Sequence, residues 1–129
     1  MTTQDPKPMV LQLLDSIERE LKLVETVCFK VARGREKRFL DLVGALISDS
    51  TRTPGIMTFN LHKCLQVHEP HTEYLLCEVW RDRDALRKQW ESDFLKIFHG
   101  KLVSENVLVT APELKFFQYD RVTDKNTSL

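Results

Sequence analysis

Two segments with the alternating pattern of β-strands carry side chains that could do chemistry. Within 56–63 an amide and an imidazole share one face, and within 74–80 a carboxylate and an indole share one face. If the strands are neighbours and these faces coincide, the four groups converge. A base could then take a proton from a hydroxyl group, the amide could stabilise a developing oxygen anion, and the indole could orient an aromatic ligand. The expected catalytic residues are His62, Trp80, Glu78 and Asn60.

Each of these residues also has a purely structural interpretation. Trp80 could be a core side chain packed under a helix, with Glu78 paired to a helix cap or an arginine. His62 lies on the polar side of its strand, where a solvated or hydrogen-bonded histidine is common. These alternatives stay open at the level of sequence.

The elements that must position these residues follow from hydrophobic periodicity and capping signals. Residues 23–31 alternate as a strand, with Glu25 among the apolar residues of one face. Asp82 and Ser92 are expected to begin helices, and Gly100 to end the second of them. The predicted order is a helix at 9–21, a strand at 23–31, a helix after Gly34 that ends near Ser50, strands at 56–63 and 74–80, helices after Asp82 and Ser92, and a last extended segment at 107–109 and 114–119.

After the first helix this order is strand, helix, strand, strand, helix, strand. It predicts an α+β, ferredoxin-like split βαβ fold, with an antiparallel sheet covered by helices on one face only. The other face is rich in apolar residues, and a second copy of the chain is the simplest cover. We expect a homodimer built from a domain at 22–119, preceded by a leader and amphipathic helix at 1–21 and followed by a polar tail at 120–129.

Composition limits the classes of partner. The chain has 129 residues, 19 basic and 19 acidic, and a formal net charge of zero, which argues against nucleic-acid and membrane-surface binding. It shows neither a secretory leader nor an apolar run that could cross a membrane, so we expect a cytoplasmic protein. The three cysteines show no CxxC spacing, which indicates neither a disulfide framework nor a zinc site.

Several motifs together resemble the antibiotic biosynthesis monooxygenase family over roughly residues 22–119. They combine a Pro-Gly after the first domain helix, an aromatic-x-Leu strand, a Glu-x-Trp step with acidic neighbours, and a Ser-x-x-Phe-like step between two short helices. In this sequence they are Pro54-Gly55, Ile56–His62, Tyr74–Asp82 and Ser92-Asp93-Phe94.

The resemblance implies a dimeric α/β barrel that oxidises quinols, anthrones or aromatic polyketide-like substrates with molecular oxygen. It implies no metal and no other cofactor, because the electron-rich substrate anion itself reduces oxygen. A small aromatic molecule is therefore the expected partner. The expected substrate-binding residues are Phe59, Tyr74, Trp90, Phe94 and His99.

Two other functions stay open. Haem-degrading relatives use a Trp and a following His on this helical region, which Trp90 and His99 resemble, but Val27 stands where their first-strand Asn is expected. The leading function lacks one motif as well. Some quinol-oxidising relatives have an Asn four residues before the Trp of this strand, and Leu76 stands at that position here. The alternative from another class is a non-catalytic dimer that binds a small molecule or is purely structural.

Overall fold

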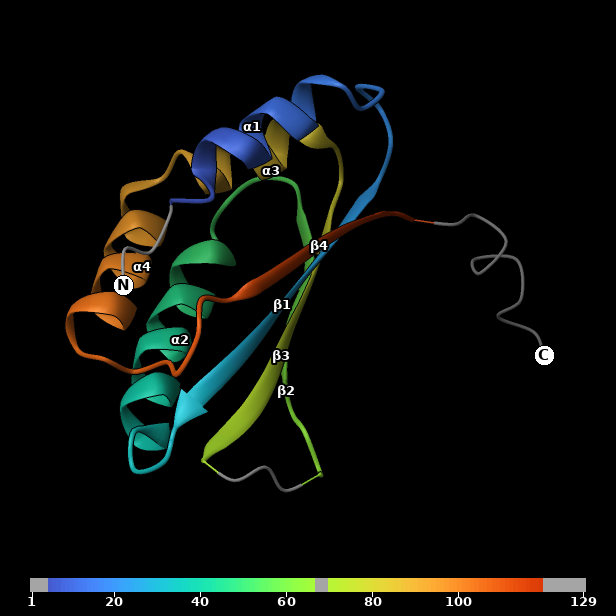
Figure 1. Ribbon diagram of the computed structural model, residues 1–129. Coiled ribbons are helices and arrows are strands. Elements are labelled where there is room, and N and C mark those ends of the chain that lie inside the picture. The colour runs from blue at the N-terminus through green and yellow to red at the C-terminus, as the bar shows by residue number, and fades with distance from the viewer. Residues whose placement is uncertain (1–4, 67–69, 120–129) are drawn as a thin grey trace.

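The computed structural model describes residues 5–66 and 70–119, so the predicted tail at 120–129 lies outside the described residues. The described part forms an α+β fold, which confirms the predicted class and element order (Figure 1). Its elements are α1 (Lys7–Asp15), β1 (Leu23–Ala32), α2 (Glu36–Ser50), β2 (Ile56–Lys63), β3 (His71–Trp80), α3 (Arg83–Trp90), α4 (Asp93–Ser104) and β4 (Glu113–Gln118).

The four strands form one antiparallel sheet in the order β2-β3-β1-β4. The helices lie on one side of this sheet, and no element within residues 5–66 and 70–119 covers the other side (Figure 1). Strands β2 and β4 are its edges, and the sheet does not close into a barrel within one chain. None of the described helices is long and apolar enough to cross a membrane.

The core lies between the sheet and the helices, because side chains on β1 and β3 alternate in burial. An aromatic cluster joins the layers at its centre. The ring of Phe39 on α2 lies 5.1 Å from that of Phe29 on β1 and 4.9 Å from that of Tyr74 on β3, and Phe98 on α4 meets Phe29 edge-on at 6.0 Å. These contacts fix the helices on the inner face of the sheet.

We call the opposite surface of the sheet the outer face. It carries the strand side chains that point away from the helices. Apolar residues lie at the centre of this face, where Leu75 on β3 is 39% exposed, and at one edge, where Phe117 on β4 is 48% exposed. Val24 pairs with Val79 and with Phe117 across the two ladders of β1. The predicted uncovered apolar face is therefore present.

The helices after β3 start at the predicted caps, but the predicted end of the second one is wrong. The Asp82 carboxylate accepts a hydrogen bond from the Ala85 amide at 2.9 Å, and the Ser92 hydroxyl accepts one from the Leu95 amide at 3.3 Å. Helix α4 continues through Gly100 to Ser104 because buried Leu102 extends its apolar face. It ends where Asn106 adopts a positive φ of 51°.

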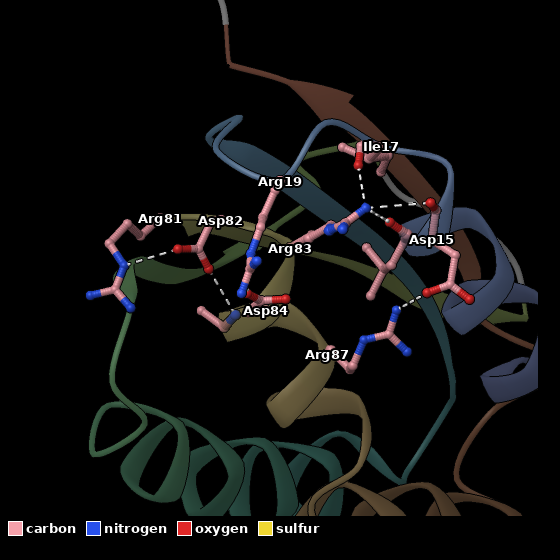
Figure 2. A network of polar contacts seen from close by, with 10 residues as sticks. Asp15, Ile17, Arg19, Arg81, Asp82, Arg83, Asp84 and Arg87 are labelled. Atoms are coloured by element: carbon pink, nitrogen blue, oxygen red, sulfur yellow. Dashed lines mark hydrogen bonds and ion pairs between the residues drawn. The ribbon is translucent and has the colours of Figure 1, made fainter.

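Helix α1 lies against α3 and ends at Asp15, earlier than the predicted 9–21 (Figure 2). An Arg83 Nη donates to the backbone carbonyl of Ile17 at 2.6 Å and, over longer distances, to those of Leu14 and Asp15, the last carbonyls of the helix. Arg87 also pairs with the Asp15 carboxylate. Leu14 is fully buried, so α1 packs against the rest of the fold, and the contacts of Arg83 and Arg87 hold it to α3.

The turn between α2 and β2 depends on Gly55. Its φ is +95°, and a Cβ built there would lie 2.4 Å from the Cβ of Ala85 on α3. We expect Gly55→Ala to lower the free energy of unfolding by more than about 1 kcal/mol. An alanine would be strained at this positive φ, and its Cβ would overlap the Cβ of Ala85.

The matched control is Gly44→Ala, within α2, where an added Cβ meets nothing within 4 Å. This change is expected to raise stability by up to about 1 kcal/mol through helix propensity. Urea unfolding of both variants is the measurement, and equal effects would contradict the steric role of Gly55.

Candidate active site

Side chains from the sheet and from helices α2, α3 and α4 line a small cavity between the two layers. Its volume is about 10 Å³, which is room for one water molecule. Aromatic and aliphatic side chains form most of its wall. The polar side chains that line it are Glu25, Glu78, Gln89 and His99.

Two buried carboxyl groups form the sheet side of this cavity. Glu25 on β1 is 2% exposed and Glu78 on β3 is 4% exposed, and the two residues lie directly opposite each other in the ladder. A hydrogen bond joins their carboxyl groups. No Lys or Arg is among the described residues that line the cavity, so the pair has no cation to balance its charge there.

A tryptophan indole holds each carboxyl group in place. Trp90 Nε1 donates to Glu25 Oε1 at 3.1 Å, and Trp80 Nε1 donates to Glu78 Oε1 at 2.9 Å. Trp90 comes from α3, whereas Trp80 lies on the same strand and face as Glu78. Both carboxyl groups are thus oriented by groups that favour their ionised form.

Burial dominates the acid–base behaviour of the pair. It raises the pKa of Glu25 to about 8, although hydrogen bonds from Trp90 and Glu78 act in the opposite direction. Burial, the charge of Glu25 and the hydrogen bond to Glu25 raise the pKa of Glu78 well above its ordinary value. The two groups titrate as a coupled pair, and burial keeps protons on the pair at neutral pH.

His99 completes the polar lining from α4. Its ring lies 5.5 Å from that of Trp90 and 5.7 Å from that of Phe98, tilted in both cases. Burial lowers the pKa of His99, so its imidazole is neutral at pH 7. His99 lies within α4, which continues to Ser104.

The structure brings together only part of the predicted site. Glu78, Trp90 and His99 line the cavity. Trp80 does not line it but donates a hydrogen bond to Glu78. Three predicted substrate-binding aromatics do not line it. Tyr74 packs on Phe39, and Phe59 and Phe94 belong to the surrounding core: Phe59 is buried opposite Glu78, and Phe94 is partly buried.

The predicted convergence of Asn60 and His62 with Glu78 is wrong. A β-bulge between Ile56 and Thr58 shifts the register by one residue, so Asn60 pairs with Cys77 and His62 with Leu75. A one-residue shift moves side chains to the opposite face, and both residues therefore lie on the outer face. Phe59 takes the inward position opposite Glu78 instead.

Two polar cavity residues were missing from the predicted set. Glu25 is a charged residue at an inward, otherwise apolar position of its strand, a pattern that could have identified it. Gln89 lies one helical turn from buried Ala85 and Leu86, which places it on the buried face of α3. Val27 and Leu76 contribute apolar walls, so the only amide side chain among the described lining residues is that of Gln89.

The buried pair predicts an unusual dependence of stability on pH. Between pH 4.5 and about 8 the unfolded chain has released the Glu25 proton that the folded chain still holds. The free energy of unfolding therefore falls as pH rises through this window. Glu25→Gln keeps the hydrogen-bonding shape and is expected to reduce the slope by up to about 1.4 kcal/mol per pH unit.

Urea unfolding at intervals from pH 5 to pH 8 measures this slope. The matched control is Glu20→Gln, which changes an exposed carboxylate and is expected to keep the wild-type slope. A Glu25→Gln slope equal to that of the wild type would show that Glu25 is ionised in the folded protein throughout this range.

Comparison with solved structures shows the same fold in several proteins. A conserved protein from Methanosarcina mazei is 22% identical, with a TM-score of 0.67 over 78% of this chain and 95% of that chain. A Pseudomonas aeruginosa protein is 22% identical, with a TM-score of 0.62 over 81% and 99% of the two chains. SnoaB from Streptomyces nogalater, described as a cofactor-independent oxygenase, is 18% identical, with a TM-score of 0.61 over 76% and 92%.

No protein of curated function matches the sequence significantly. A family model matches residues 23–99, which run from the start of β1 through α3 to His99 on α4. This range contains the carboxyl pair, both tryptophans and Gln89, and leaves out α1. The chain belongs to the antibiotic biosynthesis monooxygenase family.

Proposed function

We propose that this protein is a cofactor-independent monooxygenase that acts on quinol or aromatic polyketide-like substrates. The observation that carries the proposal is the buried Glu25–Glu78 pair in an aromatic cavity, in a chain of a monooxygenase family. A carboxyl group with a pKa of about 8 is a suitable acceptor for a phenolic proton. The fold shared with the oxygenase SnoaB is consistent with this chemistry.

The proposed reaction begins with proton transfer from a substrate hydroxyl or activated C–H group to the Glu25 carboxylate. Glu78 and Trp90 keep that carboxylate oriented through their hydrogen bonds, and are positioning residues. The resulting substrate anion gives its electrons to molecular oxygen and forms a C–O bond. When a ring CH₂ group becomes C=O, one oxygen atom stays in the product and the other leaves as water, which balances atoms and electrons.

Substrate entry requires a change in the cavity. A volume of about 10 Å³ is far below that of an aromatic ring system, so helices α3 and α4 must move away from the sheet to admit one. Trp90 and His99 come from these helices and would then contact the substrate. Haem degradation is less well supported, because Val27 presents an apolar side chain where the resemblance expects an amide.

Oxygen uptake in metal-free buffer with a quinol or an anthrone tests the proposal. We expect kcat/KM to rise with pH and level off above about 8, where Glu25 is ionised. Glu25→Gln should lower kcat by about 100-fold or more, since it removes the base but keeps a hydrogen-bond acceptor for Trp90.

The matched control for this test is Glu20→Gln, which changes an exposed carboxylate that does not line the cavity and is expected to keep wild-type kcat. An unchanged kcat in Glu25→Gln would refute the assigned base. No uptake above the buffer rate across a panel of quinols and anthrones would refute the monooxygenase proposal.

The outer face of the sheet supports the proposal of a homodimer. Leu75, Phe117 and Val79 present apolar surface there that a second copy of the chain would bury. Leu75→Asp is expected to convert the dimer to a monomer, because it places a charge at the centre of that surface.

Leu40→Asp is the matched control, since Leu40 on α2 is 44% exposed and Leu75 is 39% exposed. Sedimentation velocity measures the outcome. A dimer that survives Leu75→Asp, or that dissociates only in Leu40→Asp, would place the interface elsewhere.

A further inference from the structure

Gln89 on α3 is a buried amide whose hydrogen bonding is incomplete. It is 2% exposed, and its Nε2 donates to the Ser50 hydroxyl at the end of α2 at 2.8 Å. Its Oε1 has no hydrogen-bond partner within the described part of the chain. An unpaired buried polar atom costs about 1–3 kcal/mol, so its retention calls for an explanation.

The incomplete pairing does not depend on which way the amide points. The Ser50 hydroxyl can accept from Nε2 or donate to Oε1, so a half-turn of the amide leaves Nε2 unpaired in place of Oε1. A hydroxyl group on a ligand can donate to an unpaired Oε1 or accept from an unpaired Nε2. A ligand hydroxyl group can therefore pair with Gln89 in either orientation of the amide.

Gln89 lines the same cavity as the carboxyl pair, from the opposite layer of the fold. Glu25 and Glu78 lie on the sheet, and Gln89 lies on α3, next to Trp90, whose indole reaches Glu25. The wall between these polar ends is aromatic and aliphatic, with Phe98 and Leu46 among its members. This arrangement suits a flat ring system with one oxygen group at each end.

We propose that Gln89 is a specificity-determining residue, whose unpaired amide atom binds a second oxygen group of an aromatic substrate while Glu25 faces the first. The inference rests on the proposed function, because it concerns the same cavity and the same class of substrate. It adds that the preferred substrates carry two oxygen groups across the ring system. An aromatic molecule with one hydroxyl group leaves Gln89 unpaired and binds more weakly.

The test compares two probes by anaerobic calorimetry, so that binding is measured without turnover. The probes are 1,4-dihydroxynaphthalene, which carries two hydroxyl groups, and 1-naphthol, which carries one. We expect the wild type to bind the first about 10- to 100-fold more tightly. Gln89→Met keeps the side-chain length without the amide, and is expected to bind both probes with similar affinity.

Two further variants separate specificity from stability. Gln89→Leu is a second apolar replacement, expected to lose the preference in the same way. Ser50→Ala removes the protein partner of Gln89 but leaves its amide in the cavity, and is expected to keep the preference. Thermal unfolding of each variant confirms that the folded protein is being compared.

Each outcome decides the inference. A preference that persists in Gln89→Met and Gln89→Leu, equal binding of both probes by the wild type, or no binding of either would overturn it. Oxygen uptake by a wild type that shows no preference overturns the role of Gln89 alone. Preferential binding lost in the Gln89 variants, without oxygen uptake on any quinol, supports the role of Gln89 and refutes the monooxygenase proposal.

Discussion

The pairing of β1 with β3 is the constraint on which the site depends. It sets Glu25 opposite Glu78 on the inner face of the sheet, under the helices, where neither carboxyl group reaches solvent. Two acids in so dry a place hold their protons, and the pKa of Glu25 rises to about 8. The folded chain thereby keeps a proton that the unfolded chain releases, so the free energy of unfolding falls as pH rises above 4.5.

The helical layer supplies the other polar side chains of the cavity and the indole that orients Glu25. Helix α3 brings Trp90 to Glu25 and Gln89 to the far side of the cavity, and α4 adds His99. Helix α1, which lies outside the family-matched region, helps to hold α3 in position. Arg83 on α3 donates to the carbonyl groups at the end of α1 and just after it (Figure 2). The N-terminal helix is thus connected to the site through the helix that carries two of its residues.

Much of the fold could be predicted from local patterns. Periodicity located the strands at 23–31 and 56–63, and Asp82 and Ser92 cap the helices expected to follow them. The ends of helices were harder to predict. Leu102 continues the buried face of α4 past Gly100, and Arg83 caps α1 through contacts between segments far apart in the sequence. Both depend on tertiary packing, which local propensity does not contain.

By itself, the sequence determined the α+β class, the family resemblance, and the shared face of Glu78 and Trp80, because alternation and motif order are local properties. Only the tertiary structure decided which residues join them. The bulge after Ile56 shifts β2 by one residue and turns Asn60 and His62 to the outer face. The partner across the ladder is Glu25, since register is settled by pairing between strands and by burial of one face, not by the pattern of either strand alone.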